Sequence, residues 1–330
     1  MSRSAAERPE PTHQRKAAIV HGGAKDHSGD VRVEPIRDFD LNRTIFQTLE
    51  GRLARYVART RVAKRVDWDP AASSAVDSAY AELRASGDDL PVAPELLRFM
   101  VEECDFDVEH ADGSFLDHLY FCMEYSGRHY PQRSSIVMLL HSILGTGTNT
   151  FAMPAEKMPA LRALMTPFEW THTEAFPSIL RLLYAGGLRS ELRANLGRFG
   201  SMESIGFHRV IDNAAITMGS EDFWIALNYQ LIHLVDFLPV ANWSAHRSDT
   251  AFIIFRDLHD LLVRADRLEA TVRYDAATGP RVLEGERHGL GSWLTTRIPV
   301  GAGEKMAGKA VERFSQRIGH SQAYSIVWSD

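Results

Sequence analysis

Apolar residues recur at helical spacing along most of this 330-residue chain. Between residues 37 and 278 they return every three or four positions, which is the period of a helix that buries one face. Pro, Gly and capping residues bound these segments, as at Pro94 and Gly186. The pattern therefore predicts a mainly α protein built as a helical bundle.

The individual helices follow from this pattern and from the residues that flank each segment. We expect helices over residues 41–66, 74–86, 94–106, 115–126, 134–144, 159–168, 173–187, 220–238 and 248–276. The segment 134–144 is apolar nearly all round, which predicts a central buried helix. Residues 197–210 include three glycines and are expected to be irregular.

The two ends of the chain depart from the helical pattern. Residues 1–36 are rich in Pro, Gly and charged residues and show little periodicity, which predicts a mobile tail. After residue 278, Gly and Pro become frequent, and short β-branched segments such as AYSIVW flank one amphipathic helix at 304–318. We expect a helical domain over 37–278, followed by a small, partly β C-terminal appendage over 279–330.

Composition and charge exclude some classes of partner. The net charge of −6 argues against nucleic acid or an anionic membrane as the main partner, because both call for basic patches. No apolar run approaches the roughly 20 residues of a membrane span, and the N-terminal segment lacks the apolar core of a secretion signal. Cys104 and Cys122 lie in or beside helical patterns, so we expect buried thiols in a cytoplasmic protein. A small-molecule substrate is the expected partner, and the oligomeric state stays open.

The candidate chemistry is carried by histidines on apolar segments. His118 lies beside the apolar face of 115–126, His141 ends the apolar run of 134–144, and His110 lies just upstream. One such histidine is usually a hydrogen-bonded core residue, whereas several on neighbouring helices favour a shared site. Imidazole is a common ligand for Zn and Fe, and acidic oxygens would complete the coordination shell.

The segments FLDHLYFCMEYS and IVMLLHSILGT resemble the start of an HD-domain fold, over roughly residues 108–151. More narrowly, they are similar to an uncharacterised bacterial family with a DH helix followed by an HS-x-x-GT segment. The resemblance implies an HD-domain-like bundle in which His118 and His141 are the first two ligands of a divalent Fe, Mn or Zn ion.

The resemblance also implies a later acidic ligand, for which the chain offers two positions. Asp236 fits the expected order and shares a helix side with His233 at i, i+3. Asp266, in RADRLEA, resembles the closing segment of such domains but lies far along the chain. We include His233 and Asp236 in the predicted metal site.

The chain departs from the family pattern at Ser142, where the resemblance implies the Asp of a His-Asp pair. A neutral serine cannot supply the charge of that carboxylate. Either the site is remodelled with Asp117, Glu124 or His110, or it has been lost. Asp117 and His110 are also the candidate acid–base groups.

Two further segments are candidates for the site. His172 and Glu174, in WTHTEAF, could be site residues or part of a helix-capping region. The loop GTGTNT could cradle a phosphate with its backbone N–H groups, but it follows the negative end of a helix and no P-loop lysine comes after it.

Together these observations favour a divergent HD-like metal-dependent enzyme. The resemblance implies a hydrolase that acts on a small molecule or phosphoester, with the metal activating water. Two alternatives remain open. One is an HD-like non-haem iron oxygenase of small-molecule metabolism, and the other is a non-catalytic helical ligand-binding protein that has lost the metal site.

Overall fold

The computed structural model describes residues 23–25, 31–33, 92–104, 109–110, 113–145, 152–237, 250–272 and 302–329. The helices expected over 41–66 and 74–86 lie outside these residues. So do the domain boundaries expected near residues 36 and 278, and all four stay predictions.

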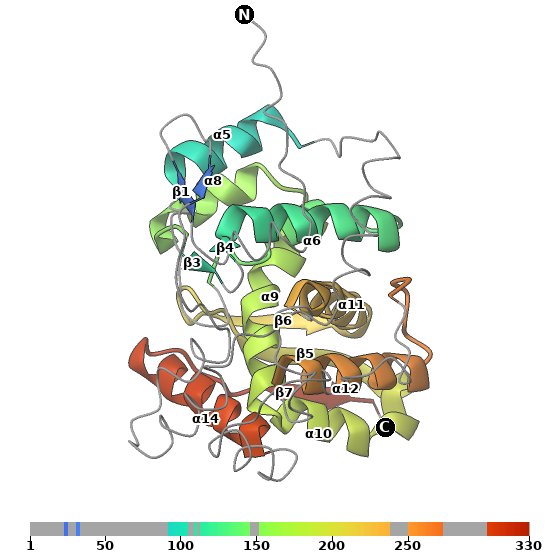
Figure 1. The fold of residues 1–330 in the computed structure, drawn as a ribbon. Coiled ribbons are helices and arrows are strands. Elements are labelled where there is room, and N and C mark those ends of the chain that lie inside the picture. The colour runs from blue at the N-terminus through green and yellow to red at the C-terminus, as the bar shows by residue number, and fades with distance from the viewer. Residues whose placement is uncertain are drawn as a thin grey trace, which may run out of the picture.

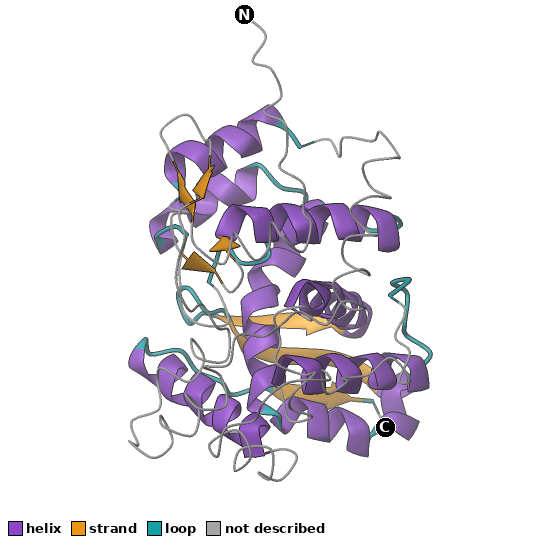
Figure 2. Cartoon of the chain, in the orientation of Figure 1, coloured by secondary structure: helices purple, strands orange, loops and turns teal. Residues whose placement is uncertain are grey.

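Helices make up most of the described part of the chain (Figures 1 and 2). The α-helices are α5 (Pro94–Glu103), α6 (Phe115–His129), α7 (Ile136–Leu140), α8 (Met158–Ala163), α9 (Pro167–Ala185), α10 (Gly187–Ala194), α11 (Ser220–Phe237), α12 (Thr250–Arg264) and α14 (Ala302–Arg317). Two short 3₁₀ helices are η1 (Ala155–Lys157) and η2 (Leu196–Ser201). The mainly α class is therefore confirmed, and no described helix is long and apolar enough to cross a membrane.

Helix α9 runs through the middle of the molecule and contacts α7, α10, α11, α12 and α14 (Figure 1). A capping box fixes its start: the Thr166 hydroxyl accepts from the backbone N–H of Glu169, and the Glu169 carboxylate accepts from that of Thr166. The helix ends at Gly186, whose φ of 85° is a left-handed conformation that glycine adopts without strain.

A three-stranded antiparallel sheet packs beside α11, in the order β6–β5–β7 (Figure 1). Its strands are β5 (Met202–His208), β6 (Ala215–Gly219) and β7 (Ser325–Trp328). Two small antiparallel pairs occur elsewhere: β1 (Gly23–Lys25) with β2 (Val31–Val33), and β3 (Glu109–His110) with β4 (Gly113–Ser114). The strand expected in AYSIVW is confirmed as β7, which pairs with β5.

The prediction that residues 197–210 are irregular is wrong, because this segment contains most of η2 and the central strand β5. Ile205 and Phe207 alternate with less buried positions and place their side chains in the core. Gly206, between them, lies opposite Ser325 in the register, and a Cβ atom at this position would come 3.2 Å from the Ser325 Oγ. The glycine therefore permits close strand pairing rather than breaking the strand.

Three expected helices end earlier than the sequence pattern indicates. Helix α8 ends at Ala163 instead of continuing to residue 168. Helix α7 ends at Leu140, and turns follow over residues 141–144. Helix α12 ends at Arg264. Two residues later, Asp266 adopts a left-handed φ of 54°. The backbone after Asp266 instead bonds to other elements, which outweighs the helical pattern of its side chains.

The described apolar side chains form two clusters. The larger surrounds α9, α11 and α12 and includes the inner face of the sheet. The smaller lies among α5, α7 and α8, and α6 contributes side chains to both. Cys104 and Cys122 are buried and free of disulfide bonds, as expected.

Helix α14 packs against the last turn of α9 through Gly308. A Cβ atom there would lie 3.0 Å from the Tyr184 carbonyl oxygen and 3.3 Å from that of Ala185. We expect Gly308→Val to lower the free energy of unfolding by about 2 kcal/mol, because the side chain would force α14 off α9. Urea denaturation measures this. Gly200→Val is the matched control, since a Cβ at Gly200 meets no atom within 4 Å; an equal loss in both variants would contradict the packing argument.

Candidate functional site

Two of the predicted metal ligands, His141 and His233, lie in contact in the protein interior. Their ring centroids are 4.7 Å apart with an interplanar angle of 66°, and both side chains are buried. His141 follows the end of α7, and His233 lies in α11. Phe176 of α9 contacts both imidazoles, at 4.7 and 5.3 Å between ring centroids.

The orientation of His141 is fixed by a backbone hydrogen bond. Its Nδ1 lies 2.7 Å from the carbonyl oxygen of Met138. Because a carbonyl oxygen only accepts, Nδ1 carries the hydrogen and the lone pair is on Nε2. In metal-bound histidines one ring nitrogen is likewise held by a carbonyl or a carboxylate.

The separation of the two rings is compatible with a shared metal ion. A ligating nitrogen lies about 2.1 Å from the metal, and the ring centroid lies about 1.1 Å further, so two such rings at about 90–110° have centroids about 4.5–5.2 Å apart. The observed 4.7 Å falls in that interval. Within the described residues, no group of three or more His, Cys, Asp or Glu side chains is arranged to hold a metal.

The other predicted site residues are placed only by their backbone. Asp117 and His118 belong to α6, His110 to β3 and Asp236 to the last turn of α11, and their side chains lie outside the described part of the chain. Helix α6 contacts both α7 and α11, so it runs beside the helices of the imidazole pair. The roles of these four residues stay predictions.

The remaining candidates separate into buried and exposed groups. Ser142 is buried next to His141. Asp266 is exposed just after α12. Glu174 binds Arg209 of the β5–β6 connection, so its carboxylate ties the hairpin to α9. The GTGTNT loop lies outside the described residues beyond Gly145.

Helix α9 begins at Pro167, so His172 lies in its second turn and is not part of the N-terminal cap. Its side chain is fully buried and contacts Phe168 at 4.3 Å between ring centroids, with the two rings tilted by 53°. Its Nε2 is 3.3 Å from the Asp222 carboxylate, but this contact lacks the alignment of a hydrogen bond. Burial lowers the pKa of His172 to about 4, while Asp222 acts to raise it and Arg133 to lower it.

His172 and the imidazole pair share one interface between α9 and α11. On α9, Phe168, His172 and Phe176 are spaced four residues apart, so they lie on one face. On α11, Tyr229 contacts His172 at 5.7 Å between ring centroids, and His233 follows one turn later. The three histidines therefore occupy a single layer, in which His172 and His233 belong to α9 and α11 and His141 enters from the turn after α7.

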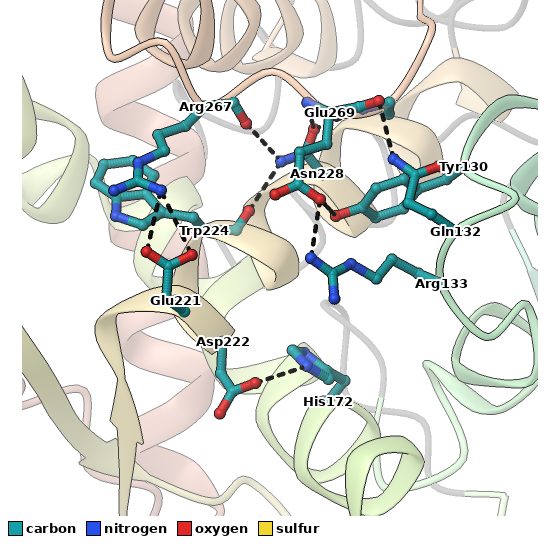
Figure 3. Close-up of polar contacts among 11 residues, drawn as sticks. Tyr130, Gln132, Arg133, His172, Glu221, Asp222, Trp224, Asn228, Arg267 and Glu269 are labelled. Carbon is teal, nitrogen blue, oxygen red and sulfur yellow. Dashed lines mark hydrogen bonds and ion pairs between the residues drawn. The ribbon is translucent and has the colours of Figure 1, made fainter.

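A polar network borders this layer where the α6–α7 connection meets the segment after α12 (Figure 3). The Glu269 carboxylate accepts from the Tyr130 hydroxyl at 2.8 Å and from Arg133 at 3.2 Å. Asn228 of α11 bonds the backbone of Glu269, which holds that segment against α11. Sequence reasoning did not single out Arg133 or Tyr229 as site residues. The i, i+4 spacing of Tyr229 and His233 in α11 was a usable signal for Tyr229, whereas no local pattern indicates Arg133.

Comparison with protein-family models, with curated proteins and with solved structures found no match. The case for a function therefore rests on the geometry of the layer between α9 and α11.

Proposed function

We propose that the protein is a metal-dependent enzyme of small-molecule chemistry, in which His141 and His233 are metal ligands. The observation that carries the proposal is their ring contact at 4.7 Å in the interior, with His141 oriented by the Met138 carbonyl. His118 and Asp236 are the proposed further ligands, in line with the resemblance of this segment to HD domains. Fe, Mn and Zn all suit such a set of imidazole and carboxylate donors.

The proposed reaction is hydrolysis of a small molecule or phosphoester. A bound metal of this kind lowers the pKa of a coordinated water and so supplies hydroxide at neutral pH. The protein's own part is to hold His141 in one tautomer, to position His233 on the rigid helix α11 and to exclude water with Phe176. An iron oxygenase would use the same imidazole pair, so the identity of the bound metal separates the two reactions.

We expect the purified protein to bind about one equivalent of Fe, Mn or Zn and to melt at a higher temperature with metal than without it. His141→Gln and His233→Gln are each expected to weaken metal binding at least 10-fold, because each removes one imidazole ligand. Inductively coupled plasma mass spectrometry measures the metal content, and scanning calorimetry measures the melting temperature.

His172→Gln is the matched control, because His172 is an equally buried histidine of the same layer but not a proposed ligand. Circular dichroism shows whether each variant folds. If the folded wild type neither retains nor binds any of the three metals, the enzyme proposal fails and the non-catalytic ligand-binding alternative takes its place. If the His141 and His233 variants keep full metal content, the ligand assignment is wrong.

A further inference from the structure

We infer that Arg133 and His172 form a binding site for the oxyanion group of a small molecule, a carboxylate or a phosphate. The two side chains come from the α6–α7 connection and from α9 and lie on the same side of the polar network (Figure 3). The inference does not depend on a metal at His141 and His233.

The guanidinium of Arg133 has more N–H donors than its contact with Glu269 uses. One terminal nitrogen donates a hydrogen bond to the Glu269 carboxylate at 3.2 Å. Its buried Nε has no hydrogen-bond partner among those residues. In Figure 3 the other terminal nitrogen points away from Glu269 and toward His172. The five N–H groups of arginine form a planar fork that matches two oxygens of a carboxylate or phosphate.

His172 is a buried polar group that lacks a well-formed hydrogen bond. Neither ring nitrogen has a hydrogen-bond partner among the described residues, although Nε2 faces Asp222. Such groups are uncommon in folded proteins, because each one forfeits its bonds to water. With Nε2 directed to Asp222, Nδ1 is a buried nitrogen without a hydrogen-bond partner among the described residues.

Two charges of opposite sign act on His172, and the carboxylate of Asp222 has the larger effect on its pKa. Arg133 is close enough for its positive charge to lower the pKa of His172, whereas Asp222 raises it. Tyr229 of α11 is a further titratable side chain that contacts the ring. An oxyanion beside Arg133 would offset its charge and accept a hydrogen bond from protonated His172. Binding would therefore take up a proton.

The Arg133 side of the site meets solvent, and the His172 side is buried. The side chains of Arg133 and Asp222 are 31% and 45% exposed, whereas His172 is fully covered. Phe168 and Tyr229 pack on the imidazole and make the inner wall apolar. The site therefore offers an anionic group the exposed side of Arg133, with apolar rings packed on the buried histidine.

The test is titration of the full-length protein with inorganic phosphate and with benzoate. Calorimetry in buffers of different ionisation enthalpy measures affinity and proton uptake, and the NMR signal of the His172 ring reports its pKa. We expect at least one anion to bind and to raise the pKa of His172 from about 4. Arg133→Gln is expected to weaken that binding at least 10-fold. The two anions separate a phosphate site from a carboxylate site.

Arg267→Gln is the matched control, because Arg267 has a similar exposure, 33%, and also pairs with a glutamate, Glu221. Arg133→Lys keeps the charge and the reach to Glu269 but lacks the fork, so an intermediate affinity is expected. The inference is overturned if neither anion shifts the His172 signal at millimolar concentration. It is also overturned if Arg267→Gln weakens binding as much as Arg133→Gln, since that would indicate a general effect of charge.

Discussion

Replacing Asn228 with alanine is expected to lower the free energy of unfolding by about 3–4 kcal/mol, measured by urea denaturation. The side chain is fully buried. Its Nδ2 donates to the carbonyls of Trp224 and Arg267, both at 2.9 Å. Its Oδ1 accepts from the backbone N–H groups of Glu269 and Ala270, at 2.9 and 3.0 Å. The loss is large because alanine leaves several of these backbone groups without a partner in the interior.

Asn195→Ala is the control for the Asn228 variant. Asn195 is only half-buried, and its Nδ2 makes a single bond to the Glu191 carbonyl at the end of α10. A loss below about 1 kcal/mol is expected there, since water can replace that bond. If the two alanine variants lose the same stability, the network around Asn228 does not hold the segment after α12 in place.

Stability is expected to fall by about 3 kcal/mol between pH 6.5 and pH 4 because of His172 alone. The pKa of this histidine is lowered to about 4 in the folded protein, mainly by burial, and is near 6.5 in the unfolded chain. Between these values the unfolded state binds more protons, so stability decreases as the pH falls. Above pH 6.5 the effect is absent, and below pH 4 it is complete.

Urea denaturation across this pH range measures the effect, and His172→Phe separates it from other titrations. The variant should lose about 3 kcal/mol less than the wild type on acidification. It should still lose some stability, because burial also lowers the pKa of His320 to about 4. Asp222→Asn should increase the acid loss, since the carboxylate acts to raise the pKa of His172. Identical pH dependence in the wild type and His172→Phe would contradict the assignment.

The helices were predictable from the sequence where apolar periodicity and end signals agree. Ser220, Glu221 and Asp222 mark the start of α11, and Gly186 marks the end of α9. Neighbouring residues set such ends, because a capping side chain or a left-handed glycine provides hydrogen bonds for the unpaired backbone groups of the helix next to it. The same reasoning identified α5, α6 and α14 in the right places.

The elements that were mispredicted depend on contacts between distant parts of the chain. The three glycines in 197–210 indicated an irregular segment, but strand β5 within it is held by β6 and β7 on either side. The segment after Arg264 kept a helical pattern, yet Asn228 of another helix captures its backbone. No local pattern encodes a partner that far away in the sequence.

The candidate site also combines residues that the sequence indicates with residues that only the fold brings together. His141 and His233 were named from the resemblance and from i, i+3 spacing, and the structure places their rings in contact. The position of Arg133 near His172 follows from how the α6–α7 connection meets α9, which the sequence alone does not indicate. Whether His141 and His233 bind a metal stays a prediction, to be tested by metal content.

The pairing of β7 with β5 has a consequence for how the sheet forms. Strand β5 is central because β6 covers one edge and β7, from a distant part of the chain, covers the other. Until the chain through Trp328 has been synthesised, the hairpin of β5 and β6 has an open edge whose backbone groups can pair with another polypeptide. Such non-local pairing also slows folding, because a long loop must close first. The hairpin of β5 and β6 is therefore exposed to intermolecular strand exchange until β7 has been synthesised.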